Sequence, residues 1–327
     1  MKILVISGAE VRRLLPMGVC VDLMAEALAT LARGDALNPL RGIVRVPQVH
    51  GILGMMPGYL GNPESLGLKA ISVFPGNHGT EFDSHQGVVM LFEPQHGSPV
   101  ALVDASEITA IRTAAVSGVA TRLLATEDAG DLAILGSGVQ ARTHLEAMLH
   151  VREVRRVRVF SRNRKSLDRF CAEQTVRHGI RAEAVDSAQE AVQNADIVCT
   201  TTSSREPVLE GAWLALGAHV NAVGSSVATT RELDTQAVVR SRLYVDRRES
   251  TVHEAGDYLF PLNEGAITEG HIVGEIGEIL LGKLDGRGHP EEITLFKSLG
   301  LAVEDLAAAQ QVYTRAREEG LGTAVEL

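Results

Sequence analysis

Residues 131–141 read Asp131-Leu-Ala-Ile-Leu-Gly136-Ser-Gly138-Val-Gln-Ala141, a short apolar run that leads into a glycine-rich turn. Apolar residues then recur at helical spacing up to Val151, so the pattern predicts a buried strand, a turn and a helix. In this turn Gly136 permits the tight bend, Gly138 lets backbone N–H groups approach a pyrophosphate, and Ala141 keeps the helix close to the strand. The positive end of the helix dipole would face the phosphates. The stretch therefore predicts a dinucleotide-binding unit.

The residues after the next expected strand indicate which dinucleotide binds. We expect Val157-Arg-Val-Phe160 to be the second strand of a βαβ unit. In sites that prefer NAD this strand ends in Asp or Glu, which binds the ribose hydroxyls and would repel a 2′-phosphate. Here Ser161-Arg162-Asn163-Arg164 follows, and a hydroxyl with guanidinium groups suits phosphate recognition. We expect NADP(H) to be preferred, with NAD(H) as the alternative if both arginines are ordinary solvated charges.

Composition bounds the class of protein. The chain has 327 residues, 45% of them hydrophobic, which is enough for two domains with their own cores. Its net charge of −10 provides no basic surface for nucleic acid or for an anionic membrane. The three cysteines lie far apart and the eleven histidines show no ligand spacing, so neither a disulfide framework nor a metal site is expected. Without a signal peptide or a membrane-spanning run in the sequence, we expect a cytoplasmic protein.

The sequences before and after the glycine turn predict different kinds of secondary structure. Residues 1–6 predict a strand, and residues 11–32 predict a helix that Gly34 ends. Between residues 40 and 104, short β-type runs broken by Gly and Pro predict a mixed or antiparallel sheet. Beyond residue 124, strands alternate with helical segments, which predicts a doubly wound parallel sheet.

Two helices are expected to connect these parts. One covers residues 106–124, with Ser106 or Thr109 as its N-cap, and another covers residues 303–317. We therefore expect an α/β protein with two domains. Residues 116–304 form a Rossmann-type doubly wound NAD(P)-binding domain, and residues 1–115 together with 305–327 form a second, α+β domain.

Three cations in the β-rich half are candidates for holding an anionic substrate. Lys69 lies inside the otherwise apolar run 66–74, where a lysine is costly unless it is paired or exposed. Arg112 lies on the helix that leads to the nucleotide domain, and Arg41 precedes the first β-type run. A guanidinium fork fits a carboxylate well. The ordinary alternative is that each is a surface charge.

Seven segments, in order along nearly the whole chain, resemble motifs of the ornithine cyclodeaminase / mu-crystallin family. They are Lys69-Ala-Ile-Ser-Val-Phe, Ser84-His-Gln-Gly-Val-Val-Met-Leu-Phe-Glu-Pro94, Ile111-Arg-Thr-Ala-Ala-Val-Ser117, Gly136-Ser-Gly-Val-Gln-Ala141, Asn221-Ala-Val-Gly-Ser-Ser226, Arg231-Glu-Leu-Asp234 and Leu295-Phe-Lys-Ser-Leu-Gly300. This ordered set is far more specific than one glycine turn. The family acts at the α-carbon of amino or imino acids, and it implies a homodimer joined through the β-rich domain, which would also bind the substrate.

The resemblance assigns expected roles to individual residues. Arg41, Lys69 and Arg112 match the positions that hold and polarise the substrate carboxylate. Besides Gly136 and Gly138 of the turn and Arg162, the expected cofactor contacts are Ser84, Arg112, Val139, Gln140, Ser161, Thr202 and Ser298.

Two departures favour one branch of the family. Cyclodeaminases that resemble this chain carry an aspartate where it has Ser226, and a glutamate before the Met-Pro pair where it has Met55. Those acids handle the substrate amines and the proton transfers. Without them the chain is closer to the ketimine reductase / pyrroline-2-carboxylate reductase branch.

The expected reaction is NAD(P)H-dependent, reversible reduction of a cyclic imino acid, pyrroline- or piperideine-2-carboxylate, to the cyclic amino acid. Lys69, Arg112 and Ser226 are the expected catalytic residues. Lys69 would deliver the proton, and Ser226 would position a water. The alternatives are an ornithine cyclodeaminase, which forms proline and ammonia, an alanine or other amino-acid dehydrogenase, and a mu-crystallin-like binding protein without turnover. Ring size and physiological direction stay open.

Overall fold

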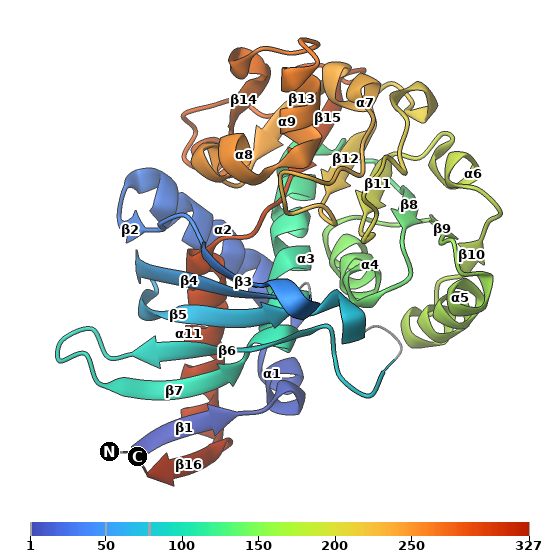
Figure 1. Cartoon of the computed structure of the whole chain (residues 1–327). Coiled ribbons are helices and arrows are strands. Elements are labelled where there is room, and N and C mark those ends of the chain that lie inside the picture. Colours follow the sequence, from blue (N-terminus) through green and yellow to red (C-terminus); the bar gives the residue numbers. More distant parts are fainter. Residues whose placement is uncertain (1, 50, 78–79, 327) are drawn as a thin grey trace. The chain divides into compact units, whose positions relative to one another are not determined.

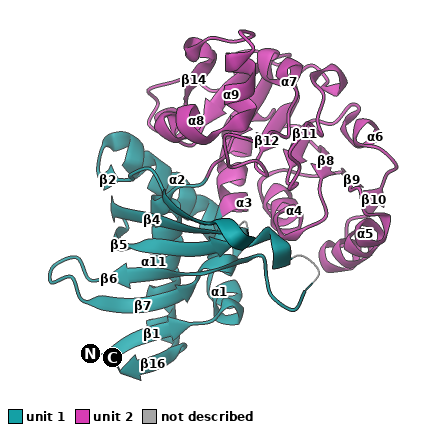
Figure 2. Cartoon of the chain, in the orientation of Figure 1, with its two compact units in different colours: residues 1–112, 300–327 teal, residues 113–299 magenta. Residues whose placement is uncertain are grey.

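The structure, a computed structural model, describes residues 2–49, 51–77 and 80–326. The chain forms two compact units, which Figure 2 colours separately. Unit 1 comprises Met1–Arg112 and Gly300–Leu327, and unit 2 comprises Thr113–Leu299. The first boundary falls within helix α3 (Ala105–Leu124), so the chain leaves unit 1 along a helix and returns to it for its last segment.

Unit 1 is built around an eight-stranded sheet. Its strands run in the order β16-β1-β7-β6-β5-β4-β2, and β3 also pairs with β4. Only the β1–β7 pair is parallel among these pairings. The elements are β1 (Lys2–Ile6), α1 (Gly8–Leu14), α2 (Met17–Arg33), β2 (Ala36–Leu37), β3 (Gly42–Val46), β4 (Gly51–Gly61), β5 (Glu64–Val73), β6 (His85–Phe92), β7 (Pro99–Asp104), α11 (Ala302–Glu319) and β16 (Thr323–Glu326). Because β1 pairs with β16, the two ends of the chain lie together (Figure 1).

One face of this sheet is covered by helices. Helix α11 passes behind β4 to β7 in Figure 1, and it packs on β4, β5, β6 and α2. Side chains alternate in burial along β4, where Met56 and Leu60 are buried and Met55 is 39% exposed. This period of two is that of a strand with a single covered face. Among the described residues of unit 1, no α-helix is drawn in front of this sheet in Figure 1.

The first predicted helix is interrupted. Residues 11–32 were expected to form one helix, but α1 ends at Leu14 and α2 begins at Met17. The prediction was wrong here because Pro16 lacks the N–H group that a continuous helix needs, and it serves instead as the N-cap of α2. Gly34 ends α2 as expected, in the left-handed conformation at φ 92°.

Unit 2 contains a fully parallel eight-stranded sheet in the order β10-β9-β8-β11-β12-β15-β13-β14. Its elements are β8 (Asp131–Leu135), α4 (Val139–Val151), β9 (Arg156–Phe160), α5 (Arg164–His178), β10 (Ala182–Ala184), α6 (Ala188–Val192), β11 (Ile197–Thr200), β12 (His219–Ala222), α7 (Thr235–Val239), β13 (Ser241–Val245), α8 (Arg248–Glu254), α9 (Gly256–Asn263), β14 (Ile272–Glu275), α10 (Ile276–Leu280) and β15 (Ile293–Lys297). The strand order reverses between β8 and β11, as in a Rossmann-type fold, and the predicted α/β class is confirmed.

The N-cap of α3 differs from the prediction. Ser106 or Thr109 was expected at this position, but α3 begins at Ala105. Asp104 Oδ1 accepts the N–H of Glu107 at 2.8 Å and so performs the capping. Ser106 Oγ instead donates to the His85 carbonyl. Asp104 belongs to the apolar run of β7, which concealed its capping role in the sequence.

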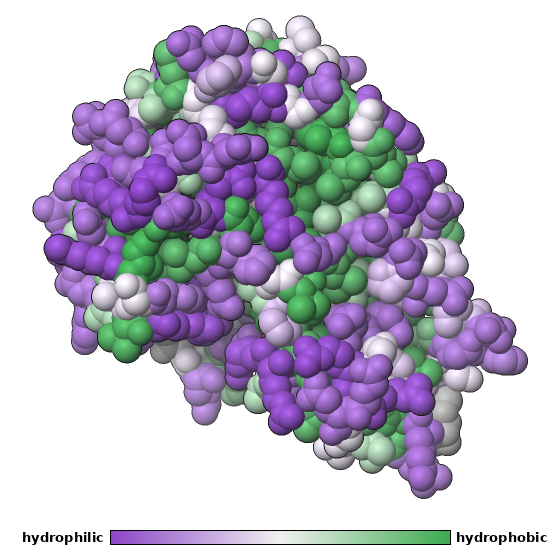
Figure 3. Space-filling view, turned by 180° about the vertical axis from the view of Figure 1, so that it is seen from behind, coloured by the Kyte–Doolittle hydropathy of each residue, from purple (hydrophilic) through white to green (hydrophobic). Residues whose placement is uncertain are grey.

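The helices of the described chain give little sign of a membrane span. No single described helix is long and apolar enough, and α1 with α2 reaches the length only across a bend of 84°. Val11, Leu14 and Val21 of that pair are buried within unit 1. The face in Figure 3 is largely hydrophilic with apolar patches between, which is ordinary for a protein surface.

Candidate active site

The glycine turn has the geometry that its sequence predicts. Gly136 lies at φ 125°, and a Cβ atom there would come within 2.7 Å of Thr201 Oγ1 and 2.8 Å of the Thr201 carbonyl oxygen. Only glycine adopts this conformation without strain. Gly138 has φ −96° and is the N-cap of α4, with no side-chain hydrogen bond to cap the helix.

The N-terminus of α4 is suited to a pyrophosphate. A Cβ atom on Gly138 would meet no atom within 4 Å, so there is open space over the first turn of a 13-residue helix. Val139, the first residue of that helix, is 57% exposed. Backbone N–H groups at such an end bind anions well. The residues present therefore fit a dinucleotide.

In the segment after β9, Ser161 contacts the glycine turn and Arg164 is paired with aspartates. Ser137 Oγ donates to Ser161 Oγ at 3.0 Å, which joins the two segments predicted to contact the cofactor. Arg162 is exposed. Arg164 contacts Asp168 at 2.8 Å and Asp186 at 2.5 Å, so one of the two arginines expected to attract a 2′-phosphate is already paired.

Thr202, Ser226 and Ser298 each follow the carboxyl end of a strand. Strands β11, β12 and β15 end at Thr200, Ala222 and Lys297 and are neighbours in the sheet. Ligands of open α/β sheets bind outside this edge, beside the position at which the strand order reverses. Ser298 Oγ is buried and has no hydrogen-bond partner among the described residues, which suits a ligand contact.

In unit 1, Lys69 and Arg112 meet at the first turn of α11. Lys69 Nζ lies 2.6 Å from Asp305 Oδ2. Arg112 donates from Nε to Asp305 Oδ1 at 2.8 Å and from Nη1 to Glu304 Oε2 at 2.9 Å. All four side chains are at most 4% exposed. The two cations are therefore buried and paired, and neither is an ordinary surface charge.

A third cation lies at the same place. The partly buried Arg41 donates from Nη2 to the Gly300 carbonyl at 3.3 Å. Burial lowers the pKa of Lys69 to about 8, while Asp305 raises it and Arg112 lowers it further. Gly300 has φ 81°, and a Cβ atom there would lie 2.4 Å from the Arg112 guanidinium. This arrangement can accept one carboxylate and can hold a proton near neutral pH.

Comparisons with known proteins show the family of the chain. The model of the ornithine cyclodeaminase/mu-crystallin family matches residues 1–320. The chain belongs to this family. A ketimine reductase mu-crystallin of Mus musculus is 41% identical over 290 residues, 88% of each chain. A delta(1)-pyrroline-2-carboxylate reductase of Bacillus cereus is 37% identical over 324 residues, 99% of each chain.

A solved structure of the family resembles the whole chain. The delta(1)-pyrroline-2-carboxylate reductase of Thermococcus litoralis, in complex with NADH and L-proline, superposes with a TM-score of 0.97 at 40% identity. The match covers 99% of this chain and 100% of that one. The family predicted from seven short segments is thus confirmed.

Met55 and Ser84 were also singled out within the family motifs. Met55 pairs with Ala70 in the β4–β5 ladder, whereas Met56 pairs with Lys69. Successive side chains of a strand point to opposite faces. Met55 is therefore on the face opposite Lys69. The significance of its missing carboxylate stays a prediction. Ser84 precedes β6 and contacts its neighbour His85 at 3.2 Å, and its predicted cofactor contact stays a prediction.

Sequence reasoning missed the acids that hold the cations. Glu304 and Asp305 stand at the start of a helix that was predicted for its alanines, and nothing in the local pattern separates them from surface acids. The buried charged side chains of Glu232 and Lys297 in unit 2 were also missed. Lys297 had a weaker signal than Lys69, because it is the last residue of its strand and does not interrupt an apolar run.

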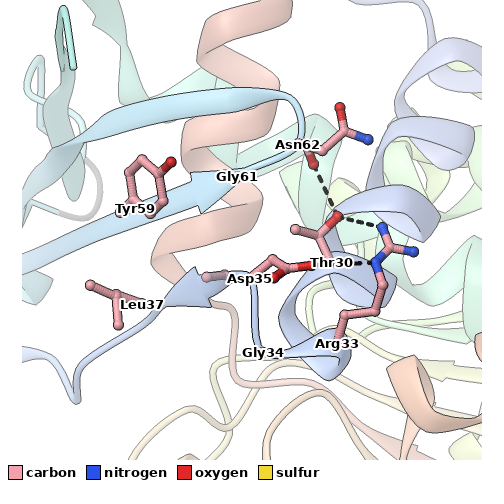
Figure 4. Close-up of a pocket in the computed structure, with 9 residues that line it drawn as sticks. Thr30, Arg33, Gly34, Asp35, Leu37, Tyr59, Gly61 and Asn62 are labelled. Atoms are coloured by element: carbon pink, nitrogen blue, oxygen red, sulfur yellow. Dashed lines mark hydrogen bonds and ion pairs between the residues drawn. The ribbon is translucent and has the colours of Figure 1, made fainter. Parts of the chain in front are cut away.

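One further pocket lies in the described part of unit 1, away from the predicted site residues. The pocket in Figure 4 has a volume of about 430 Å³ and is lined by residues of α2, β2, β4 and the turns that follow α2 and β4, none of them a predicted site residue. There Thr30 Oγ1 accepts from Arg33 and donates to the Asn62 carbonyl. Among the described residues, no three His, Cys, Asp or Glu side chains are grouped so that they could hold a metal ion.

Proposed function

We propose that this chain is an NAD(P)H-dependent reductase of cyclic imino acids, pyrroline- or piperideine-2-carboxylate, that also oxidises the cyclic amino acid in reverse. The observation that carries the proposal is the buried pair Lys69 and Arg112, each fixed by a carboxylate of α11. Burying charges is costly. Three cations gathered at one place, two of them fixed by carboxylates, suit a ligand that carries a carboxylate. The family relatives that reduce imino acids supply the reaction class.

The residues of unit 1 act mainly by orientation. Arg112 is held at two atoms by Asp305 and Glu304, so its guanidinium keeps one direction while a substrate carboxylate binds. Fixed cations beside developing charge lower the barrier without reorganisation, and a fixed carboxylate orients the α-carbon. A bound reduced nicotinamide would supply the hydride to that carbon. Hydride transfer requires both ligands to be bound at once.

Lys69 is the group that we assign to proton delivery. Reduction of a C=N bond leaves nitrogen in need of a proton. With a pKa of about 8, Lys69 is protonated at neutral pH and yet releases its proton more readily than an ordinary lysine. The partly buried Ser226 remains our candidate for positioning a water.

The main alternative is cyclodeamination. At Ser226 this chain lacks the carboxylate that resembling cyclodeaminases carry, and the described residues around Lys69 supply carboxylates that are already paired with cations. One assay separates the two reactions. With pyrroline-2-carboxylate, the absorbance of NADPH or NADH should fall and proline should form. If cofactor is not consumed while ornithine yields proline and ammonia, the chain is a lyase and the proposal is wrong.

We propose that NADP(H) is the preferred cofactor and NAD(H) a weaker one. The support is the lack of an acid after β9, where Ser161 and Arg162 stand. Because Arg164 is paired with two aspartates, Arg162 is the arginine that we expect to bind the 2′-phosphate. Arg162→Ala should therefore raise the KM for NADPH about tenfold, as loss of a charged phosphate contact does, and leave the KM for NADH nearly unchanged. An equal effect on both cofactors would contradict the preference.

We propose that the protein works as a homodimer in the cytoplasm, joined through the open face of the unit 1 sheet. That face carries exposed apolar side chains in adjacent strands. They are Val44 (51% exposed), Leu53 (39%), Met55 (39%) and Val88 (37%). Val44 pairs with Leu53, and Met55 and Val88 both pair with Ala70, so these side chains lie in two neighbouring rows. A contiguous apolar patch of this kind marks an interface.

A further inference from the structure

A second cluster of buried charges lies in unit 2 and has no role in the reaction described above. Glu232 is fully buried, and Asp257 and Lys297 are 2% and 1% exposed. Glu232 belongs to the segment 231–234, which matches the family but carries no assigned function. Burial and the neighbouring Asp257 raise the pKa of the Glu232 carboxyl group. A carboxylate kept in such a place needs compensation from donors that surround it.

Glu232 accepts four hydrogen bonds from the ends of two neighbouring strands. Its Oε1 accepts from Thr202 N and from Thr202 Oγ1, both at 2.7 Å. Its Oε2 accepts from Thr200 Oγ1 at 2.8 Å and from Gly224 N at 2.6 Å. Thr200 ends β11, and Gly224 follows β12. One side chain thus joins the two loops that leave the carboxyl edge of the sheet.

The site requires a carboxylate and not an amide. Each oxygen of Glu232 faces one backbone N–H group, which can only donate. A glutamine would place its NH₂ group against one of them, so a buried donor would lose its partner. Gly224 also needs to be glycine, because a Cβ atom there would lie 2.6 Å from Glu232 Oε1 and 2.0 Å from the Thr202 carbonyl oxygen.

Asp257 and Lys297 hold the same region from another side. Asp257 Oδ1 accepts from the N–H groups of Glu232 and Leu233 at 2.7 and 3.0 Å. Lys297 Nζ lies 2.9 Å from Asp257 Oδ2 and donates to the carbonyl oxygens of Ser225 and Ala222 at 2.5 and 3.2 Å. The segment between Ala222 and Ser225 is therefore held by Glu232 at an N–H group and by Lys297 at two carbonyl groups.

We propose that Glu232 is a positioning residue for the dinucleotide, which fixes Thr202 and the loop that begins at Gly224 in the arrangement that binds the cofactor. The inference rests on the proposed NAD(P)H-dependent function. Its ground is location, because both loops leave the edge of the parallel sheet where open α/β folds bind their ligands. Thr202, a predicted cofactor contact, donates two of the four hydrogen bonds. All of the contacts described here lie within unit 2.

The test compares Glu232→Gln, which affects the contacts at the carboxyl end of β11, with a variant at the amino end of β11. Asp196, which precedes β11, accepts from the N–H groups of Gly130 and Asp131 at 2.8 Å each, so Asp196→Ala also removes acceptors of two backbone donors. The dissociation constants of NADH and NADPH are measured by fluorescence titration without imino acid, and thermal unfolding is followed in parallel. In Glu232→Gln the dissociation constants should rise about tenfold or more, as for loss of a positioned contact. In Asp196→Ala they should stay within about twofold, because the sites are separate, although unfolding occurs at lower temperature in both.

Steady-state kinetics add a second readout. Glu232→Gln should raise the KM for the cofactor while kcat at saturating cofactor changes much less, because the residue contacts no reacting atom. Equal cofactor affinity in Glu232→Gln and wild type would overturn the proposal. So would an equal loss of affinity in Asp196→Ala, since the effect would then follow from stability alone.

A milder variant keeps the proposal testable if Glu232→Gln does not fold. Thr200→Val removes one hydroxyl donor and leaves both backbone donors on Glu232. Its cofactor dissociation constant should rise by about twofold to fivefold, as for loss of one hydrogen bond. No change in that variant, with Glu232→Gln unfolded, would overturn the proposal. Binding of cofactor by wild type without reduction of imino acid would instead contradict only the proposed function.

Discussion

At the scale of single residues, Lys69 predicts a pH dependence. Its pKa is lowered from 10.5 to about 8, chiefly by burial. Because the protonated form holds the carboxylate and delivers the proton, kcat/KM for imino-acid reduction should fall as pH rises through about 8. Lys69→Arg keeps the charge at all accessible pH values and should lose this alkaline limb, although its rate is lower. A limb that persists unchanged in Lys69→Arg would exclude Lys69 as its source.

The same shift predicts an opposite trend for stability. Between pH 8 and 10.5 the unfolded lysine binds more protons than the folded one. The contribution of Lys69 to the free energy of unfolding therefore increases as pH rises through that window, which makes the protein more stable. Urea unfolding of wild type and Lys69→Met across the window measures it: the difference in stability between the two proteins should change in favour of wild type as pH increases. No change, or a change in favour of Lys69→Met, would contradict a lowered pKa.

Asp305 is the residue whose loss should affect the cluster most, because it pairs with both cations. Asp305→Asn leaves Lys69 without its ion pair, and breaking a buried pair costs about 3–5 kcal/mol of unfolding free energy. It should also move the alkaline limb of Lys69 to lower pH, since Asp305 raises that pKa. Glu318→Gln, an exposed change on the same helix, is the control and should cost less than about 0.5 kcal/mol in urea unfolding. A stable Asp305→Asn with an unshifted limb would contradict the pairing.

Local sequence reveals one member of such a pair more readily than the other. Lys69 could be singled out because it interrupts an apolar strand, which a lysine does only when it is paired or exposed. Asp305 could not, because its partners come from segments remote in sequence and an acid in the first turn of a helix is ordinary. Long-range charge pairing is a property of the folded chain.

At the scale of elements, the turn from β8 to α4 makes opposite predictions for its two glycines. Gly136→Ala forces an alanine to φ 125° and against Thr201, and should lose about 1–3 kcal/mol of unfolding free energy. Gly138→Ala meets no atom, so stability should change by less than about 0.5 kcal/mol. Its methyl group occupies the space over the helix N-terminus, so the dissociation constant for NADH should rise about tenfold.

Thermal or urea unfolding and NADH titration of both variants check the pair. If Gly138→Ala binds NADH as wild type does, the pyrophosphate is not bound at the N-terminus of α4. A Gly136→Ala variant as stable as wild type would contradict the strained geometry of the turn.

The sequence predicted the existence of elements better than their ends. The strand, turn and helix of residues 131–151 follow from apolar spacing and two glycines, and the structure has them as β8 and α4. The break at Pro16 and the cap at Asp104 were missed, because the apolar periodicity runs through both positions. Periodicity reports which side of an element is buried, whereas hydrogen bonding decides where the element stops.

At the scale of the whole molecule, the α/β class followed from the alternation of strands and helices after residue 124. The sequence could not give the strand order, in which β15 lies between β12 and β13 although it is last of the three in the chain. Nor could it show that β1 pairs with β16. Such pairings join segments remote in sequence, and apolar patterns do not encode a partner.

The proposed homodimer gives a prediction at this same scale. In the monomer, Met55 lies on the open sheet face in a row with Ala70 and Val88. A glutamate there would be a buried, unpaired charge in a dimer joined through this face, which is strongly unfavourable, but harmless in a monomer. Sedimentation should therefore find wild type dimeric and Met55→Glu monomeric at the same concentration. The matched control is Val176→Glu on α5, where the side chain is 87% exposed, and it should stay dimeric. A monomeric wild type would contradict the dimer itself, whereas a dimeric Met55→Glu would show that the subunits join through another surface.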